Sequence, residues 1–247
     1  MPSILAIIPA RYASTRFPGK PLIDLGGKTM IQRVYEQTKL ASLIQDVVVA
    51  TDDDRIFNHV RSFGGKVVMT GNHSSGTDRC FDALQQQQKK YEYVINVQGD
   101  EPFIQPAQID LLAAALDGTT EIATLAKKIT DTETIFNANV VKVVFNQHGK
   151  ALYFSRSPIP HVRNKPESEW LQSTPFYKHI GMYAYRSDVL QKITSLPVSL
   201  LEQAESLEQL RWLEHGYSIS VFETEIENLG IDTPEDVQRA LTWLQSR

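Results

Sequence analysis

Strand-like and helix-like segments alternate through the first half of the chain, and this order constrains the fold more than any other feature. Short apolar runs occur at residues 3–8, 46–50, 66–69 and 93–97. Segments with helical spacing of apolar residues separate them, and Pro106 suits the first position of a further helix. The alternation predicts an α/β fold, with a mostly parallel central sheet and helices on both faces.

The second half is less regular. Strand-like runs occupy residues 139–145, 151–154 and 178–185, and helix-like runs occupy 205–214 and 233–244, with Thr233 as cap and Pro234 as first helical residue. Residues 155–177 contain four prolines and no periodicity, which is typical of a lid, a binding loop or an interface arm. We expect a single domain, 1–247, with a less regular sugar-binding or dimerisation extension around 152–217.

Composition excludes several functions. A net charge of −4 argues against a general nucleic-acid binder, so local cations must hold any anionic substrate. Cys80 is the only cysteine, which rules out an internal disulfide and fits a reducing compartment. The first apolar run is too short for a signal peptide, and no run is long enough to span a membrane. We expect a soluble, cytoplasmic protein without nucleic-acid or membrane partners.

The loop after the first strand is the strongest functional signal. It reads IPARYASTRFPGKPL at residues 8–22 and places Arg11, Arg16 and Lys20 among three prolines and a glycine. Prolines stiffen the turn, Gly19 allows a close backbone approach to a ligand, and the cations suit phosphate oxygens. A solvated basic loop is the alternative, but the position after a buried strand favours a polyphosphate site. The loop is neither a Walker loop nor a dinucleotide-binding fingerprint.

Two further loops are expected at the same edge of the sheet, because ligands bind outside the carboxyl ends of parallel strands. The segment 97–103 carries Asp100 and Glu101, which suit either Mg²⁺ or an ordinary turn. Asp232 precedes a helix, where an acidic residue is often structural. In SSGTDR, at residues 74–79, Thr77 is a candidate helix cap and a candidate ligand contact.

Other candidates lie in the second half. Strand alternation places His179, Gly181 and Tyr183 on one face, which is either a polar ligand site with room over the glycine or a solvent face. Arg156 lies where a strand leads into the long loop, and an arginine at this position suits the binding of a substrate carboxylate. Ser206 and Gln209 fit a capping box, and Glu208 fits a surface position as well as a site.

Taken together, these segments resemble the 3-deoxy-manno-octulosonate cytidylyltransferase family, the CMP-Kdo synthetases. The resemblance covers nearly the whole chain and rests on an ordered set of motifs: IPARYASTRFPGKPL, VVVATDD, SGTDR, NVQGDEPFI, NVVKVV, YFSRSPIP, HIGMYAYR, LEQLRWLE and GIDTPEDV. CMP-sialic acid synthetases share the opening Pro-Ala-Arg but diverge after it.

The resemblance implies a Rossmann-like nucleotidyltransferase fold of the nucleotide-diphospho-sugar transferase type, usually a homodimer. It implies the reaction of CTP with Kdo to CMP-Kdo and pyrophosphate, with Mg²⁺, for lipopolysaccharide assembly. The implied residues are, for the triphosphate, Arg11, Lys20 and Arg16; for the cytidine, Ala10, Ser75, Gly76, Thr77 and Arg79; for Mg²⁺, Asp100 and Asp232; and for the sugar acid, Gln98, Arg156, His179, Tyr183, Glu208 and Gln209. Lys20, Asp100 and Asp232 are the implied catalytic set.

Three other functions stay open at this point. One is a nucleotidyltransferase for another acidic sugar, such as an amino-Kdo or a sialic acid. A second is a family-A glycosyltransferase, which would use similar acidic metal ligands. The third is a non-catalytic nucleotide sensor, although the combination of Lys20, Asp100, Arg156 and Asp232 argues against it.

Overall fold

The computed structural model of the chain describes residues 2–13, 17–228, 230–231 and 233–245. These residues form two compact units, Met1–Gly118 with Glu227–Arg247, and Thr119–Ile226. The predicted extension around 152–217 lies inside the second unit. Each unit builds its own part of the sheet and its own set of functional side chains.

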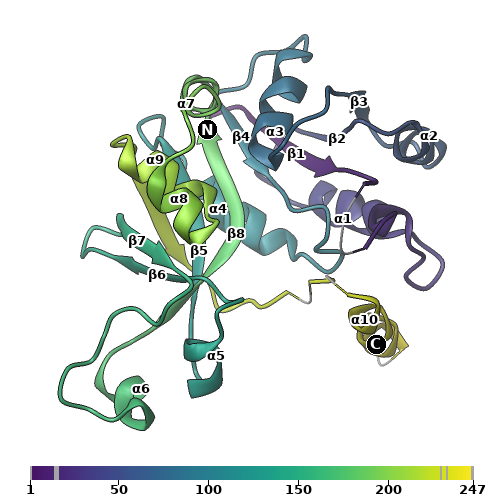
Figure 1. Ribbon diagram of the computed structural model, residues 1–247. Helices are drawn as coiled ribbons and strands as arrows, with labels where there is room; N and C mark the ends of the chain where they lie inside the picture. Colours follow the sequence, from purple (N-terminus) through teal and green to yellow (C-terminus); the bar gives the residue numbers. More distant parts are fainter. Residues whose placement is uncertain (1, 14–16, 229, 232, 246–247) are drawn as a thin grey trace. The chain divides into compact units, whose positions relative to one another are not determined.

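The first unit has a parallel sheet in the order β3-β2-β1-β4 (Figure 1). Its strands are β1 (Ile4–Ala10), β2 (Asp46–Thr51), β3 (Val67–Met69) and β4 (Tyr93–Asn96). β1 is almost entirely buried, which explains its continuous apolar run, because a central parallel strand is covered on both faces.

Among its described residues, this unit also contains five helices and a short 3₁₀ turn. They are the turn Lys20–Leu22, α1 (Met30–Lys39), α2 (Asp54–Ser62), α3 (Gly76–Gln85), α4 (Pro106–Ala114) and α10 (Pro234–Gln245). The strand order reverses direction between β3 and β4, so right-handed crossovers put α1 and α2 on one face and α3 on the other. The predicted α/β class with helices on both faces is confirmed.

Helix α10 returns the end of the chain to the start of the sheet. Thr233 caps it, as predicted, since its hydroxyl accepts from the Asp236 amide; in addition, the Asp236 carboxylate accepts from the Thr233 amide, which completes a capping box. Phe103 packs on Trp243 with ring centroids 4.4 Å apart, within a cluster that also buries Leu25. This packing joins the loop after β4 to the last helix.

The second unit is mixed rather than parallel. Its strands are β5 (Ile122–Lys128), β6 (Lys142–Phe145), β7 (Ala151–Ser155), β8 (Tyr177–Arg186) and β9 (Ile219–Glu223). β5 pairs with β9 in parallel and with β8 antiparallel, and β6 pairs antiparallel with β7 and β8. Sequence patterning missed β5 and β9, because their short apolar runs lack a clear period.

The helices of this unit are short. They are α5 (Thr132–Phe136), a 3₁₀ turn at Glu167–Glu169, α6 (Trp170–Ser173), α7 (Ser187–Ile193), α8 (Leu200–Glu205) and α9 (Glu208–Glu214). The segment 155–177, predicted to be irregular, contains α6, and its Trp170 stacks on Phe176 in a small cluster that also buries Ile129 and Ile135. Packing on residues outside the segment therefore organises a stretch that shows no sequence period.

Candidate active site

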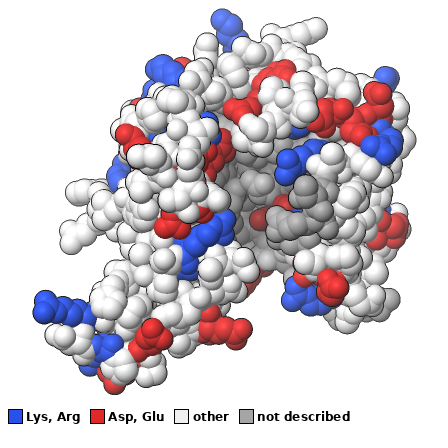
Figure 2. Space-filling view, in the orientation of Figure 1, with Lys and Arg blue, Asp and Glu red and all other residues white. Residues whose placement is uncertain are grey.

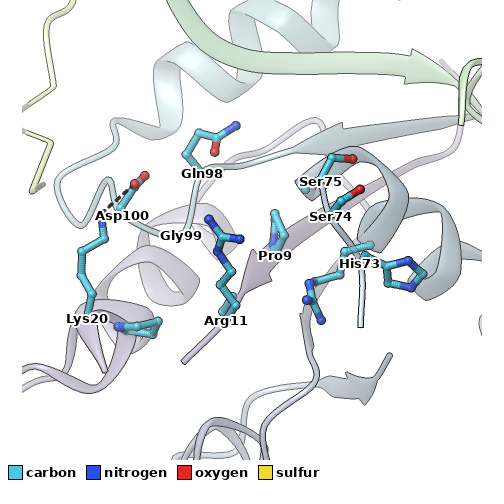
Figure 3. A pocket seen from close by; sticks show the side chains of 13 residues that line it. Pro9, Arg11, Lys20, His73, Ser74, Ser75, Gln98, Gly99 and Asp100 are labelled. Atoms are coloured by element: carbon cyan, nitrogen blue, oxygen red, sulfur yellow. Dashed lines mark hydrogen bonds and ion pairs between the residues drawn. The ribbon is translucent and has the colours of Figure 1, made fainter. Parts of the chain in front are cut away.

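A pocket of about 240 Å³ opens at the carboxyl ends of β1 and β4 in the first unit (Figure 3). It is bounded by the loop after β1, the segment before α3 and the loop after β4. Its lining residues are Pro9, Ala10, Arg11, Lys20, Pro21, His73, Ser74, Ser75, Gly76, Arg79, Gln98, Gly99 and Asp100. The edge predicted from the strand order is therefore the edge that is hollowed.

Lys20 anchors the basic loop to two distant parts of the chain. Its ammonium donates to the Asp100 carboxylate at 2.9 Å and to the Ile231 carbonyl at 2.7 Å. The Ile231 amide in turn donates to the Asp100 carbonyl at 3.2 Å. The Lys20 side chain is mostly buried, whereas that of Asp100 is 40% exposed and accessible to a ligand. A fixed cation and an accessible carboxylate thus lie side by side.

Gly19 has a different role from the one expected. Its φ of 72° favours glycine, and a Cβ would lie 3.1 Å from the Tyr12 ring. Tyr12 is itself covered by the Arg55 guanidinium, 3.2 Å from the ring centroid. Gly19 therefore permits the turn to pack on Tyr12, and it is not among the pocket residues.

Gly99 is the glycine that permits a close backbone approach in the pocket. A Cβ at this position would lie 2.7 Å from the Pro9 carbonyl oxygen, closer than side chains tolerate. The absence of a side chain lets the loop after β4 lie against the end of β1. Gln98 and Asp100, on either side of the glycine, are thereby held at the pocket (Figure 3).

The N-terminus of α3 forms the opposite wall. Ser75 is the cap, with its hydroxyl accepting from the Asp78 amide at 3.1 Å, so the expectation that Thr77 could cap this helix is wrong. Thr77 lies inside the first turn and is buried. The helix end directs backbone N–H groups and its positive dipole end toward the pocket, which favours an anionic or carbonyl-rich ligand.

Arg79 joins three segments below this wall. It is 2% exposed and donates to the Asp52 carboxylate at 2.8 Å, to the Thr70 hydroxyl at 2.6 Å and to the Gly71 carbonyl at 3.3 Å. The acidic turn after β2 therefore neutralises the arginine at the pocket. Asp52 is a supporting residue that sequence reasoning missed, although the Asp-Asp-Asp run after a buried strand offered a signal.

His73 and Ser74 also line the pocket and were missed. The His73 ring turns away from the pocket centre and shares a 2.7 Å hydrogen bond with Asp82 of α3, which also accepts from the Gly71 amide (Figure 3). This carboxylate therefore holds the first half of the segment between β3 and α3 against the helix. A local signal for this pair was present in the sequence, since His73 and Asp82 lie on either side of a predicted helix start.

Glu101 lies behind the exposed carboxylate. Burial, with a smaller contribution from the nearby Asp100 carboxylate, raises its pKa to about 7, against the lowering effect of a hydrogen bond from the side-chain amide of Asn228 at 2.9 Å. A buried carboxyl group of this kind carries its proton more readily than an ordinary glutamate. Glu101 is thus a supporting residue, and Asp100 is the available carboxylate.

Arg156 and Glu205 form the polar centre of the second unit. The Glu205 carboxylate accepts from the Ser155 hydroxyl at 2.6 Å and from the Arg156 amide at 2.9 Å. The Arg156 guanidinium donates to the carbonyls of Glu205 at 2.8 Å and Ala138 at 3.2 Å. An arginine fixed by backbone carbonyls keeps its charge and presents its remaining N–H groups.

His179 and Tyr183 lie together on β8, with ring centroids 5.2 Å apart. Thr124 donates its hydroxyl proton to the Met182 carbonyl at 2.8 Å, so it accepts at 2.9 Å from Nε2–H of His179. The network therefore assigns Nδ1 as an acceptor. Burial lowers the pKa of His179 to about 3, which keeps the imidazole neutral.

The interpretation of this β8 face as solvent-exposed is wrong. Tyr183 and Tyr185 are buried, because both pack on Trp212 of α9. Burial raises the pKa of Tyr183 well above its ordinary value, and no described residue accepts or donates at its hydroxyl. The predicted room over Gly181 is confirmed, since a Cβ there would meet nothing within 4 Å.

Glu208 and Gln209 begin α9, but no capping box includes them. The cap is Leu207, whereas Ser206 ends α8 with a φ of 52°. The capping box belongs instead to Ser199 and Glu202 at the start of α8. The predicted sugar-acid residues thus occur as a group in the second unit, while Gln98 lines the pocket of the first unit.

Two predicted residues, Arg16 and Asp232, lie outside the described residues. Within the described ranges, no cluster of three or more His, Cys, Asp or Glu side chains could hold a metal by itself. Asp100 offers an accessible carboxylate beside a cationic pocket, and Mg²⁺ commonly binds through one or two carboxylates plus substrate phosphates. The donor chemistry at Asp100 therefore fits a hard cation.

The pocket draws its charge from local cations. Acidic and basic side chains are interspersed on the visible face in Figure 2. Within the part of the chain that the structure describes, no helix is long and apolar enough to cross a membrane. A cation-lined pocket at the carboxyl edge of a parallel sheet, beside a helix N-terminus, is the arrangement typical of a nucleotide-binding α/β protein.

Comparison with known proteins narrows this class. The chain belongs to the cytidylyltransferase family, which matches residues 5–224. It is 61% identical over 239 residues to a 3-deoxy-manno-octulosonate cytidylyltransferase of Cytophaga hutchinsonii, covering 96% of each chain. It is 56% identical to the protein of that name from Parabacteroides distasonis, covering 100% of both.

Solved structures agree on the fold. The structure of a CMP:2-keto-3-deoxy-manno-octonic acid synthetase complexed with CTP is 42% identical, with a TM-score of 0.92 and 99% coverage of both chains. The 4-diphosphocytidyl-2C-methyl-D-erythritol synthase of Anaerococcus prevotii is 17% identical, with a TM-score of 0.65, 99% coverage of this chain and 96% of that one. The second likeness concerns the fold alone.

Proposed function

We propose that this chain transfers CMP from CTP to 3-deoxy-manno-octulosonate (Kdo), giving CMP-Kdo and pyrophosphate. The observation that carries the proposal is the pocket in which Lys20 and Arg11 face the N-terminus of α3 across the ends of β1 and β4. Relatives more than 50% identical over essentially the whole chain carry the name of this activity. The fold, the pocket and the family therefore support the same reaction.

The nucleotide half of the site follows from the pocket. Lys20, whose ammonium is held in place and mostly buried, and the exposed Arg11 bind the triphosphate, because ammonium and guanidinium groups both make charge-assisted hydrogen bonds to phosphate oxygens. Arg16 is proposed as a helper on the same loop. The cytidine lies against the wall formed by Ala10, Ser75, Gly76 and Arg79, with Thr77 buried behind this wall in the first turn of α3. Asp52 holds Arg79 in place for that contact.

The sugar-acid contacts are proposed for the polar group of the second unit, and Gln98, which lines the pocket of the first unit, remains a candidate from the family resemblance alone. Arg156 binds the carboxylate of Kdo through its planar fork. The neutral His179 accepts from a sugar hydroxyl at Nδ1, and the Tyr183 hydroxyl makes a second hydrogen bond to the sugar. At the start of α9, Glu208 accepts hydrogen bonds from further sugar hydroxyls, and Gln209 can both accept from them and donate to them.

The reaction is an in-line displacement at phosphorus. The anomeric hydroxyl oxygen of Kdo forms a bond to the α-phosphorus of CTP, the bond from that phosphorus to the bridging oxygen breaks, and pyrophosphate leaves with the electron pair. The hydroxyl proton passes to solvent. Lys20 and Arg11 stabilise the charge that develops on the leaving group. Positioning of the two substrates supplies much of the rate.

We also propose a magnesium ion, with Asp100 and Asp232 as its protein ligands. When bound, Mg²⁺ would neutralise phosphate charge and lower the pKa of the sugar hydroxyl. Asp100→Asn removes charge from this site, so turnover should fall more than a hundredfold while the fold persists. Calorimetric titration of Mg²⁺ with a nonhydrolysable CTP analogue gives a second readout. Unchanged kinetics at limiting Mg²⁺ would exclude the role of Asp100.

The direct test is pyrophosphate release from CTP with and without Kdo. Kdo-dependent release from CTP, and not from ATP, GTP or UTP, is the expected result. Release with an amino-Kdo or a sialic acid but not with Kdo would identify a different acceptor. Sugar transfer from a nucleotide sugar without pyrophosphate release would identify a glycosyltransferase.

The wider setting is proposed from the same family membership. The product would supply lipopolysaccharide assembly, and the enzyme would act in the cytoplasm, where CTP is available. We also propose a homodimer, because the second unit exposes several large apolar side chains that a monomer would leave in water. These side chains are Leu152, Val198, Leu200 and Leu201.

A further inference from the structure

Lys142 is a fully buried lysine that none of the proposed catalytic steps uses. It lies at the start of β6, where its register partners are Ser155 of β7 and Lys178 of β8. Removing an ammonium group from water is costly unless its hydrogen bonds are replaced. A buried lysine in this strand therefore requires a compensating set of acceptors.

The Lys142 ammonium has such a set. It donates to the carbonyl oxygens of Asn137 at 3.0 Å, Val140 at 2.6 Å and Arg156 at 2.5 Å. Three acceptors use all three N–H groups of a lysine. Among the described residues, its hydrogen bonds are to backbone carbonyls and to no carboxylate. The lysine thus joins the segment before β6 to the residue that follows β7.

Arg156 completes the connection in the opposite direction. Its guanidinium reaches back to the Ala138 carbonyl at 3.2 Å, inside the segment that Lys142 holds. Each cation therefore binds the main chain of the other's segment. Nε and one Nη group of Arg156 bond the carbonyls of Glu205 and Ala138, and a longer contact reaches Ser206, which leaves two of the five N–H groups for a ligand.

The charges in this group do not balance. Lys142 and Arg156 carry two positive charges, and Glu205, which bonds the Arg156 amide, carries one negative charge. One positive charge remains in the group, at the partly exposed Arg156 guanidinium. An arriving carboxylate neutralises it, so the arrangement favours an acid at Arg156 over a neutral sugar.

We propose that Lys142 is a positioning residue for sugar-acid binding, which acts by holding the backbone of Arg156 and of residues 137–140. It does not touch the substrate. The inference rests on the proposed function, because it requires that Arg156 binds the carboxylate of the acceptor.

The test compares the steady-state kinetics of Lys142→Met with those of the wild type. The KM for Kdo should rise about tenfold or more, whereas the KM for CTP should stay within about twofold, since the loss of charge-assisted bonds is confined to the second unit. Lys150→Met is the matched control, because Lys150 is in the same unit and donates to the Ser220 hydroxyl at 2.8 Å. It should leave both constants unchanged.

A double-mutant cycle separates positioning from general damage. If Lys142 acts through Arg156, Lys142→Met should add less than about twofold to the KM for Kdo in an Arg156→Ala background. Full additivity, or an equal rise in both KM values, would overturn the proposal. A wild type without Kdo-dependent pyrophosphate release would instead refute the proposed function.

Lys142→Gln and Lys142→Arg keep hydrogen-bond donors and cover the case in which the methionine variant does not fold. Both should show a smaller rise in the KM for Kdo than the methionine variant, and Arg should rescue best because it keeps the charge. If none of the three variants folds, as judged by circular dichroism, Lys142 is required for the fold itself and the positioning role is wrong.

Discussion

Lys20 holds together a loop, a carboxylate and a backbone carbonyl, so its replacement tests the nucleotide site most directly. Lys20→Met keeps the length of the side chain and removes its charge. The affinity for CTP should fall about tenfold to a hundredfold, the effect of losing one or two charge-assisted hydrogen bonds. Calorimetry measures it, and Lys28→Met, which breaks only an exposed pair with Glu36, is the control. Unchanged CTP affinity would contradict the role.

His179 makes stability depend on pH. Its folded pKa of about 3 is below the ordinary value of about 6.5, so between these values the unfolded chain binds a proton that the folded protein does not. The stability that the neutral His179 contributes is complete above pH 6.5, and it is lost as the pH falls toward 3. Over two pH units below 6.5 the free energy of unfolding should drop by up to about 3 kcal/mol.

Urea unfolding at pH 4.5 and 7.5 measures this effect. The His179→Gln variant should lose less stability between the two values than the wild type does. His148 is exposed and serves as the control, since His148→Gln should leave the pH dependence unchanged. Equal acid sensitivity of the wild type and His179→Gln would show that this imidazole does not titrate as described.

At the scale of single elements, substitutions at two glycines distinguish a role in packing from a role in substrate binding. Gly99→Ala places a Cβ 2.7 Å from the Pro9 carbonyl, so the loop after β4 must move. We expect a loss of about 1–3 kcal/mol in stability, as for overpacking, together with weaker CTP binding because Asp100 moves with the loop. Thermal unfolding and CTP titration check both effects. A stable variant with normal CTP affinity would show that the approach of this loop to β1 is not required.

Gly181→Ala on β8 should behave in the opposite way. A Cβ there meets nothing within 4 Å, so thermal stability should stay within about 1 kcal/mol of the wild type. The KM for Kdo should nevertheless rise severalfold, because the methyl group occupies the space over the strand. The KM for CTP is the internal control. An unchanged KM for Kdo would remove this face of β8 from the sugar-acid site.

Sequence patterns predicted the elements of the first unit well, because its parallel strands are continuous apolar runs between clear turn residues. β5 and β9 were missed, because their sequences show neither the period of a helix nor the alternation of a half-exposed strand. Lys20 and Asp100 were identified from motifs that are local in the chain. Lys142 and Glu205 were not, because the bonds that give them their role go to backbone groups of Arg156, 14 and 49 residues away, and leave no spacing to detect.

At the scale of the whole molecule, the proposed homodimer gives a test of the exposed apolar surface. Leu200 is 80% exposed and Leu152 is 61% exposed, both in the second unit. The wild type should sediment at twice the 27.9 kDa mass of the chain, and Leu200→Glu should shift it toward the monomer by burying a charge at the interface. Leu40→Glu, at a 67% exposed position of the first unit, is the control. A monomeric wild type would refute the dimer.

The bond from Lys20 to the Ile231 carbonyl has a consequence for synthesis on the ribosome. The two residues are 211 positions apart, and α10, which follows Ile231, packs against the loop after β4. At about 5–20 residues per second, the loop that carries Lys20 waits roughly 10–40 s before the segment that anchors it has been made. Until then, a nascent chain can pair its first strands but has no finished triphosphate site, so nucleotide cannot assist the early stages of its folding.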